Sequence, residues 1–508
     1  MGEKEHEVII IGMGLAALAA AARLLELGIR DIGIYAKSWG GTPFIAAINF
    51  VLPENPYGDT SEQYFKDMIA AGYRIGNKEL VRDMTDHTLA GYELLRRWGV
   101  KFAENANRTK KLRHVSGHTF PRSLCSTEDL IGLEILKKMT KEFEQKGLHP
   151  RMNAECVSLL AEDGKICGIT VLDSENRPEN IYAPIVIAAW GGVGNLFGTS
   201  TYPPDIQGNT LAIAKKAGAT LVDLEFLEYE PMVVMDPPGA LGEPCPTAML
   251  GEGGHLLNSK EERFLLRVRP QGEGGAPKTL INKQIWKEVA AGNGTPHGGV
   301  WVDLRHIDQE ILEAYPWFYN RLVKNGLDPK KQLVEVGPMA HSFSGGILVD
   351  RDYQSNIKGL FAVGEACGGL HGACRCAGNA ASQAVISGLL CAEAIDRQKN
   401  KVSLPGKVFS PFYASNQQIF DQYAPGIRSV AAKALGIYRD GTILSNAKAH
   451  VDAILQNEEI QKDTRTVQIA MAVSLMLEAA IKRKESRGTH MRLDFPEESP
   501  EFEREFTI

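Results

Sequence analysis

The chain opens with a short apolar run, then a glycine turn and a long apolar stretch. Residues 7–11 (EVIII) are largely β-branched, which is typical of a buried strand. The sequence then reads GMGLAA and stays rich in alanine and leucine to about residue 27, as a buried helix does. A second apolar run follows at residues 32–35 (IGIY). This order predicts a strand, a tight turn, a helix and a second strand, which together make a βαβ unit.

The turn of this unit has the pattern G-x-G-x-x-A. Gly12 permits the turn, Gly14 lets the backbone approach a pyrophosphate, and Ala17 lets the helix pack on the strand. The N-terminus of the helix then offers N–H groups to phosphates. The pattern favours a dinucleotide site over a plain tight turn. An acidic residue often ends the second strand of such units, but here Ala36 and Lys37 stand there, so a ribose contact would use backbone atoms or another residue.

Further glycine-rich loops punctuate the rest of the chain. One follows the second strand at residues 38–49, and another, with Gly191 and Gly192, follows an apolar strand at residues 185–187. The change of character near residues 235–247 suggests a domain boundary. From about Phe409 the pattern becomes helical and charged, and it ends in a polar tail.

Composition narrows the classes of partner. The 508 residues include 56 Lys and Arg against 62 Asp and Glu, a net charge of −6, which gives no electrostatic case for nucleic acid or an anionic membrane as the main partner. No run of 18 apolar residues and no signal peptide is visible, so we expect no membrane span and a cytoplasmic protein. The eight cysteines form no C-x-x-C series, so we expect reduced thiols and no bound metal.

Separated stretches together carry a family resemblance. They are LVDLEFLEYEP, GEGGHLLNSKEERF, GPMAHSFSGGILVD and GLFAVGEACGGLHGACRCAGNAAS, framed by GMGLAA and RKESRGTHMRLDFPE. The chain resembles the flavoprotein subunits of fumarate reductase and succinate dehydrogenase, with L-aspartate oxidase. The resemblance implies an α/β fold: a Rossmann-like FAD-binding domain with an inserted α+β capping domain and a C-terminal helical domain. The expected segments are residues 1–234 and 341–400 for the FAD-binding domain, 235–340 for the cap and 401–508 for the helical domain.

The resemblance implies FAD as the cofactor. Glu365 would accept a hydrogen bond from a ribose hydroxyl, and Asn379 and Ala380 open a helix whose positive end would stabilise charge on the reduced ring. The alternative is a loop and helix cap that merely need small residues. Some relatives link the flavin covalently through a histidine in the loop after the second strand. Here the loop has Gly41 and Thr42, expected near the cofactor, and then Pro43, so FAD should be non-covalent.

Two residues match the family's carboxylate-binding groups. His341 matches a histidine that binds a substrate carboxylate, and Arg375 matches an arginine that clamps the same group. Arginine suits this role because its planar fork pairs with both oxygens. Either residue alone would more often be a structural donor or a surface charge.

The chain departs from the family pattern beside these residues. Glu230 stands where relatives carry a histidine, and Glu228 where a glutamine is frequent. Residues two apart on a strand face the same way, so both carboxylates would enter one pocket and repel a second substrate carboxylate. The alternative is an ion pair with a neighbour such as Lys278.

The proton donor also departs from the pattern. Fumarate reductases carry Arg-Asp where this chain has Lys278 and Thr279. Lysine lacks the bidentate fork of arginine but can act as an acid in a low-dielectric site. Arg267 and Arg269 are near enough in sequence to replace it. Glu252 matches a glutamate that orients the catalytic arginine and would pair with Lys278.

Cysteine and histidine positions leave further readings open. Cys374 and Cys376 flank Arg375 where relatives usually have Asn and Leu, and they are either small packing residues or redox-active thiols. The segment HVSGHTFPR places His118 and Arg122 in a loop that contacts the flavin or substrate, or that is simply anchored.

The resulting hypothesis is an FAD-dependent oxidoreductase that moves hydride between flavin N5 and a carbon next to a carboxylate. The substrate is a small carboxylate, which need not be a C4 dicarboxylate. The alternatives are amino-acid oxidation as in L-aspartate oxidase, a flavoprotein of sulfur metabolism resembling adenylylsulfate reductase, and a subunit that only transfers electrons. An iron–sulfur protein subunit is a plausible partner for each.

Overall fold

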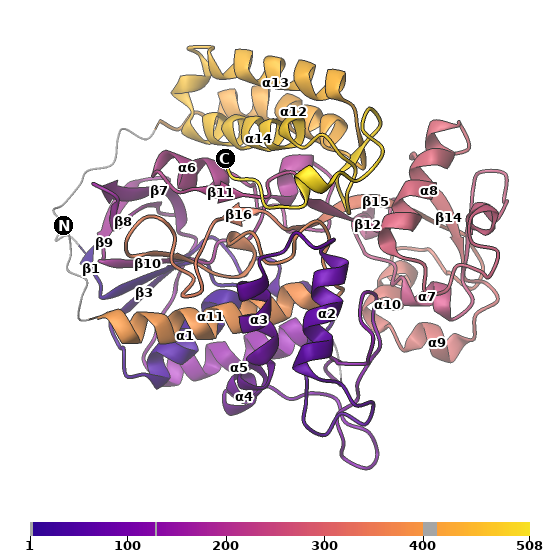
Figure 1. The fold of residues 1–508 in the computed structure, drawn as a ribbon, viewed down its shortest axis with the longest axis horizontal. Coiled ribbons are helices and arrows are strands. Elements are labelled where there is room, and N and C mark those ends of the chain that lie inside the picture. Colours follow the sequence, from indigo (N-terminus) through magenta and orange to yellow (C-terminus); the bar gives the residue numbers. More distant parts are fainter. Residues whose placement is uncertain (1–3, 128–129, 400–413) are drawn as a thin grey trace. The chain divides into compact units, whose positions relative to one another are not determined.

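The computed structural model describes residues 4–127, 130–399 and 414–508, which form two compact units (Figure 1). The large unit comprises the residues up to 198, residues 203–227 and those from 343 onward. The small unit comprises residues 199–202 and 228–342. The predicted change of pattern near Phe409, and the predicted boundary at residue 400, lie outside the described residues.

The units are coarser than the four predicted segments. The small unit starts at residue 228, before the predicted boundary at residue 235, because strand β12 (Leu227–Val234) pairs with β15 (Val334–Phe343) in the sheet of that unit. The C-terminal helices belong to the large unit and form no third compact unit. The division of the large unit into FAD-binding and helical segments stays a prediction.

A parallel five-stranded sheet forms the centre of the large unit. Its order is β17-β10-β2-β3-β6. The bounds are β2 Val8–Ile11, β3 Ile32–Ala36, β6 Arg151–Met152, β10 Ile185–Ala188 and β17 Leu360–Ala362. Ile187 lies beside Ile10 on one side and Phe361 on the other, so strands far apart in sequence are neighbours. These three strands are wholly buried, as their apolar runs predict.

Two long helices cover this sheet side by side. They are α1 (Leu15–Glu26) and α11 (Asn379–Gln398), which pack against each other (Figure 1). Small residues allow the close approach: a Cβ added at Gly388 would lie 2.6 Å from the carbonyl oxygen of Ala16. The βαβ unit expected from residues 7–35 is therefore present, with the predicted helix between its two strands.

Smaller sheets and helices complete the frame of the large unit. A four-stranded sheet has the order β1-β9-β8-β7, with bounds Lys4–Glu5, Pro178–Tyr182, Lys165–Leu172 and Glu155–Glu162. Two-stranded pairs are β4 Ile48–Asn49 with β5 Ser123–Leu124, β11 Leu221–Val222 with β16 Gly346–Ile347, and β18 Tyr438–Arg439 with β19 Met491–Arg492. The helices are α2 Ser61–Ala71, α3 Lys78–Asp86, α4 Thr88–Arg97, α5 Ile131–Gln145 and α6 Thr210–Lys216.

The C-terminal part packs three helices together (Figure 1). They are α12 Gln417–Ala434, α13 Gly441–Leu455 and α14 Thr464–Lys482. Among the described helices, α14 is long and apolar enough to cross a membrane by length and composition, yet 67% of its apolar stretch is buried inside the protein. That burial is what the core helix of a packed bundle shows, since α14 contacts α6, α12 and α13.

The segment after α14 is held by buried ion pairs. Arg483 is fully buried and donates from Nε to Glu225 at 2.5 Å and from Nη1 to Glu485 at 3.0 Å. Arg487 donates to both carboxylate oxygens of Glu485, at 2.8 and 2.9 Å. Removing one member of such a network leaves an uncompensated buried charge, which destabilises the folded state.

The small unit has its own antiparallel sheet and core. The strand order is β12-β15-β14-β13, with β13 at His255–Leu257 and β14 at Val300–Asp303. Its helices are α7 Ala248–Gly251, α8 Lys278–Ala290, α9 Gln309–Glu313 and α10 Pro316–Lys324. Apolar side chains from the sheet, such as Val302 and Val336, pack against Ile285 of α8 and Phe318 of α10.

The buried network makes a testable stability prediction. Arg483→Met should lower the free energy of unfolding by about 3–5 kcal/mol, because Glu225 loses its guanidinium partner in a buried place. The measurement is a urea titration followed by far-UV circular dichroism. The matched control is Arg177→Met, since Arg177 pairs with Asp173 on the surface and should change stability little. Equal stability of the two variants would contradict the prediction.

Candidate functional site

The turn between β2 and α1 brings the backbone close to the next strand. Gly12 has a φ of +110°, and a Cβ there would overlap the carbonyl oxygen of Ala189 after β10. Gly14 precedes α1 and supplies no side-chain cap, and the first turn of the helix has no acidic residue. Leu15 N donates to the Thr42 hydroxyl at 2.7 Å, so Thr42 fixes the start of the helix. The other backbone N–H groups at this positive end of the helix suit a phosphate.

Three predicted cofactor segments meet at one edge of the parallel sheet. Gly12, Gly192 and Glu365 follow β2, β10 and β17, which are adjacent strands. A Cβ added at Gly192 would lie 2.6 Å from the carboxyl carbon of Glu365, so the glycine leaves room for that side chain. Glu365 accepts a hydrogen bond from Phe343 N at 2.8 Å, which orients its carboxylate. Ligands bind at this edge in open α/β sheets.

The loop after β3 places the other predicted residues. The ammonium of Lys37 lies 2.8 Å from Glu155, so its side chain is used in a surface ion pair. A ribose contact at Lys37 would therefore have to come from its backbone. Gly41 is exposed and precedes the short helical turn Thr42–Phe44, which contains Pro43.

The N-terminus of α11 carries the second helix-end site. Gly378 precedes the helix without a side-chain cap, and the first turn, with Asn379 and Ala380, has no acidic residue. The Asn379 side-chain oxygen accepts from the Tyr64 hydroxyl at 2.6 Å and from Asn49 Nδ2 at 2.7 Å. The positive end of a 20-residue helix is thus held in place by buried polar groups.

The loop with His118 and Arg122 is anchored inside the large unit. Arg122 is fully buried and donates from Nη2 to Asp59 at 2.7 Å and to Asp67 at 2.8 Å, with its guanidinium 4.2 Å from the Tyr64 ring centroid. Burial lowers the pKa of His118 to about 4, so the ring is neutral near pH 7. These contacts support the reading of a structural anchor.

Arg375 lies in the glycine-rich loop before α11. It is 9% exposed, and its Nη1 donates to Cys376 O at 3.1 Å. Burial, with the charge of Arg375, lowers the pKa of the nearby His371 to about 3, so that ring is neutral and adds no charge. Cys376 is buried with Sγ 3.3 Å from Gly117 O, and burial raises its pKa. A protonated, enclosed thiol supports packing rather than redox chemistry for Cys376.

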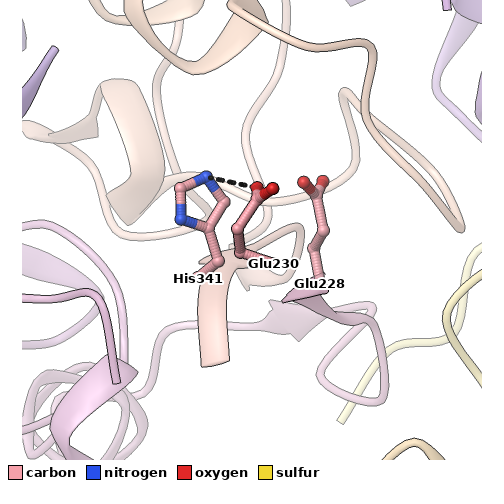
Figure 2. Close-up of side chains that lie close together, drawn as sticks. All are labelled: Glu228, Glu230 and His341. Atoms are coloured by element: carbon pink, nitrogen blue, oxygen red, sulfur yellow. Dashed lines mark ion pairs between the residues drawn. The ribbon is translucent and has the colours of Figure 1, made fainter. Parts of the chain in front are cut away.

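A cluster of charged residues occupies one place in the small unit (Figure 2). Glu228 and Glu230 come from β12 and His341 from β15, and Figure 2 shows all three side chains on the same side of the sheet. Lys278, at the start of α8, places its ammonium 2.5 Å from Glu230 Oε2 and 3.6 Å from Glu228 Oε1. The ion pair with Lys278, one of the two readings of the sequence, is therefore present.

The same Glu230 oxygen also faces the histidine. His341 Nε2 lies 3.7 Å from Glu230 Oε2, while its Nδ1 lies 2.8 Å from the Thr201 hydroxyl. Glu228 and Glu230 are 4% and 5% exposed, so solvent screens their charges weakly. Glu228, Glu230 and His341 have ligand atoms within 4.8 Å of one another, but a metal ion there would compete with the ammonium of Lys278.

The other residues predicted for the site in the capping domain are Glu252, Arg267 and Arg269. Glu252 is exposed at the end of α7, and its pairing with Lys278 stays a prediction. Arg267 pairs with Glu262 and Glu288, and Arg269 donates to Gly274 O at 2.8 Å. Both arginines are thus engaged locally, whereas Lys278 pairs with both glutamates.

Sequence reasoning did not find Thr201 or Asn282. Thr201 reaches His341 because residue 200 forms a parallel bridge with Ala340, a pairing across 140 positions that no local pattern reveals. Asn282 Nδ2 donates to Tyr229 O at 2.7 Å, between the two glutamates. In the sequence, only the position of Asn282 one helical turn after Lys278 could have indicated that it lies near this cluster.

Comparison with known proteins identifies the class. The family described as FAD binding domain matches residues 7–381, and the one described as fumarate reductase flavoprotein C-term matches residues 440–505. The fold and the glycine-lined sheet edge are those of a flavoprotein. The chain belongs to the fumarate reductase and succinate dehydrogenase family of FAD-dependent oxidoreductases, as its motifs indicated.

Relatives along the whole chain agree with this assignment. The A chain of the fumarate reductase (CoM/CoB) of Methanothermobacter marburgensis is 30% identical, covering 99% of this chain and 97% of the relative. L-aspartate oxidase of Pyrococcus abyssi is 29% identical, with 98% of both chains covered. A solved quinol-fumarate reductase has the same fold, with a TM-score of 0.86 and 24% identity over 98% of this chain and 95% of that one.

The residues of the large unit fit FAD. The start of α1, where Gly14 supplies no side-chain cap, and the overlap that a Cβ at Gly12 would cause suit a close-lying pyrophosphate, and the Glu365 carboxylate could accept from a ribose hydroxyl. The uncapped start of α11 offers N–H groups for the flavin ring.

The Gly12 turn makes the second testable prediction. Gly12→Ala should abolish flavin binding, because the added methyl overlaps Ala189 O and the residue must keep a positive φ. The measurement is the ratio of absorbance at 450 and 280 nm after purification. The control is Gly28→Ala, since nothing lies within 4 Å of a Cβ there although the φ is also positive. If Gly12→Ala bound as much flavin as the control, the prediction that this turn needs glycine would be wrong.

Proposed function

We propose that this enzyme transfers hydride between its flavin and a carbon next to a carboxylate, and that its substrate is not a C4 dicarboxylate. The observation that carries the second part is the pair of buried glutamates that share one ammonium. Bound FAD supplies the hydride chemistry at N5. The protein's own residues bind and orient the substrate and supply the proton.

Charge arithmetic supports the restriction on substrate. Glu228 and Glu230 place two carboxylates beside the ammonium of Lys278. A second substrate carboxylate beside this cluster would meet repulsion of several kcal/mol, because like charges in a weakly screened place repel strongly. A substrate with one carboxylate and an uncharged or donor group avoids that repulsion.

The roles of the remaining residues follow from their chemistry. We propose Arg375 and His341 as the groups that bind the substrate carboxylate, because a guanidinium pairs with both oxygens. Thr201 holds the His341 ring through Nδ1. Lys278 is the proposed proton donor, with its ammonium held at a defined place by Glu230.

Cofactor attachment, partners and location complete the proposal. We propose that FAD is held non-covalently, because Pro43 stands where some relatives carry the histidine that bonds the flavin. One relative is named as one subunit of a fumarate reductase, which supports a partner protein that exchanges electrons, and we propose an iron–sulfur protein in that role. We also propose a cytoplasmic location.

Amino-acid oxidation is the second candidate. The two glutamates already bind an ammonium, that of Lys278, so they can accept one from a substrate. L-aspartate oxidases are also among the relatives. The oxidative arm of the experiment below separates the two candidates.

The substrate class is tested by one anaerobic absorbance experiment. The photoreduced flavin should be reoxidised by fumarate at least about 10²-fold more slowly than by an unsaturated monocarboxylate such as crotonate, because of the charge repulsion. Glu228→Gln, which leaves the Glu230–Lys278 pair in place, should raise the ratio of the fumarate rate to the crotonate rate about 10-fold.

The same experiment separates the rival functions. An artificial acceptor controls for a flavin that can be reoxidised at all. Rapid return of the 450 nm band with fumarate would overturn the restriction on substrate. Bleaching of the oxidised flavin by L-aspartate, which is itself a C4 dicarboxylate, would favour amino-acid oxidation and would also overturn the restriction on substrate.

The proton donor makes a separate prediction. Lys278→Met should lower turnover about 10²-fold or more without changing flavin content, because general acid catalysis contributes at least that much. Lys278→Arg, which restores the residue of the fumarate reductases, should retain most of the activity. The measurement is steady-state turnover with the substrate found above. An unchanged kcat in Lys278→Met would assign the proton to another group.

A further inference from the structure

The closing motif RKESRGTHMRLDFP, residues 483–496, lies against the loop that carries Arg375. Thr489 N donates to Ala373 O at 2.9 Å, and the Thr489 hydroxyl donates to the same oxygen at 3.1 Å. Gly488 has a φ of +57°, and a Cβ there would overlap Ala373 O. The carbonyl two residues before Arg375 is thus held by two hydrogen bonds from a segment more than 100 residues later.

The other side of this loop is held by the N-terminal part of the chain. Ala373 N donates to Gly72 O at 3.1 Å, and Asn77 N donates to Gly369 O at 2.8 Å. The backbone N–H of Ala373 is therefore bonded to the N-terminal part of the chain, and its carbonyl oxygen is bonded to the closing motif. A loop with its peptide groups held from two sides has little freedom to move.

The segment that holds Ala373 is itself fixed by the buried ion pairs. Arg487 Nη1 donates to Tyr73 O at 3.2 Å and its Nη2 to Ser499 O at 3.1 Å, in addition to its pairing with Glu485. Residues 483–490 thus form one rigid support, tied to the neighbourhood of residue 72 as well.

His490, next to Thr489, adds a further constraint. Its Nδ1 lies 2.7 Å from Arg439 Nη1 and its Nε2 lies 3.0 Å from Arg483 O. Burial, with the charge of Arg439, places its pKa well below the ordinary value, so the ring is neutral. A guanidinium can only donate and a carbonyl can only accept, so Nδ1 accepts and Nε2–H donates. The residue after Thr489 therefore has one defined tautomer and orientation.

We propose that Thr489 is a positioning residue for substrate binding: through Ala373 O it sets the place of Arg375. The proposal rests on the function proposed above, in which Arg375 binds the substrate carboxylate. A small displacement of such a group weakens catalysis strongly, because a shift of about 1 Å can lower a rate about 10²-fold. The closing motif thus contributes to substrate affinity without touching the substrate.

The test compares variants of the full-length flavoprotein. Thr489→Val removes the hydroxyl but keeps the shape of the side chain, and Thr489→Ser restores the donor. Thr489→Val should raise the KM for the carboxylate substrate about 5-fold, the equivalent of one neutral hydrogen bond, with a smaller change in kcat. It should also speed deuterium exchange of peptides covering residues 369–376. Thr489→Ser should behave like the unmodified protein.

A matched control separates positioning from stability. Thr140 also donates its hydroxyl to a backbone carbonyl, that of Leu136 at 2.7 Å, but in α5. Thr140→Val should leave both KM and the exchange of residues 369–376 unchanged. Flavin content and melting temperature are recorded for each variant, so that a general loss of folding is recognised.

The outcomes distinguish this proposal from the one on which it rests. Unchanged exchange of residues 369–376 in Thr489→Val would overturn the positioning role, whatever the substrate is. Faster exchange with unchanged KM would also overturn it, because the loop would then move without consequence for binding. If Arg375→Ala leaves KM unchanged, the proposed function fails, and that failure is visible separately from the exchange data.

Discussion

The parallel pairing of β10 with both β2 and β17 is the constraint on which the large unit depends. Its register places Ala188 between Ile11 and Ala362, so the three strands end at the same level of the sheet. The residues that follow these strands, with Gly12, Gly192 and Glu365 among them, must then share one edge. Because parallel strands need long crossovers, segments of very different sequence position build a single cofactor cradle.

Two carboxylates share one cation in each unit. Asp59 and Asp67 pair with Arg122 in the large unit, and Glu228 and Glu230 pair with Lys278 in the small unit. The two places differ in burial, because the Arg122 side chain is fully buried whereas the Lys278 side chain is 17% exposed. Breaking a fully buried pair costs stability, which suits a structural anchor. A partly exposed cation can be reached by a ligand.

Much of the fold could be predicted from the sequence, because local residue patterns determine it. The βαβ unit and its G-x-G-x-x-A turn follow from residues 7–35, and the family motifs indicated FAD and the insertion of a second unit. The small unit starts at residue 228, before the predicted boundary at residue 235, because strand pairing and not composition sets its start. The sequence left two readings for Glu228 and Glu230, since only the folded chain shows that Lys278 reaches both. Thr201 and Thr489 act through contacts with segments more than 100 residues away, which no spacing rule reveals.

The insertion of the small unit has a consequence for synthesis of the protein. Strand β10 ends at residue 188 and its partner β17 begins at residue 360, so about 170 residues separate the two. At ordinary translation rates the ribosome needs roughly 10 to 30 seconds to make that stretch. During this time the apolar edge IVIA of β10 lacks one neighbour, and an uncovered edge strand can pair with other chains. The nascent chain can therefore aggregate through this edge until β17 has been made.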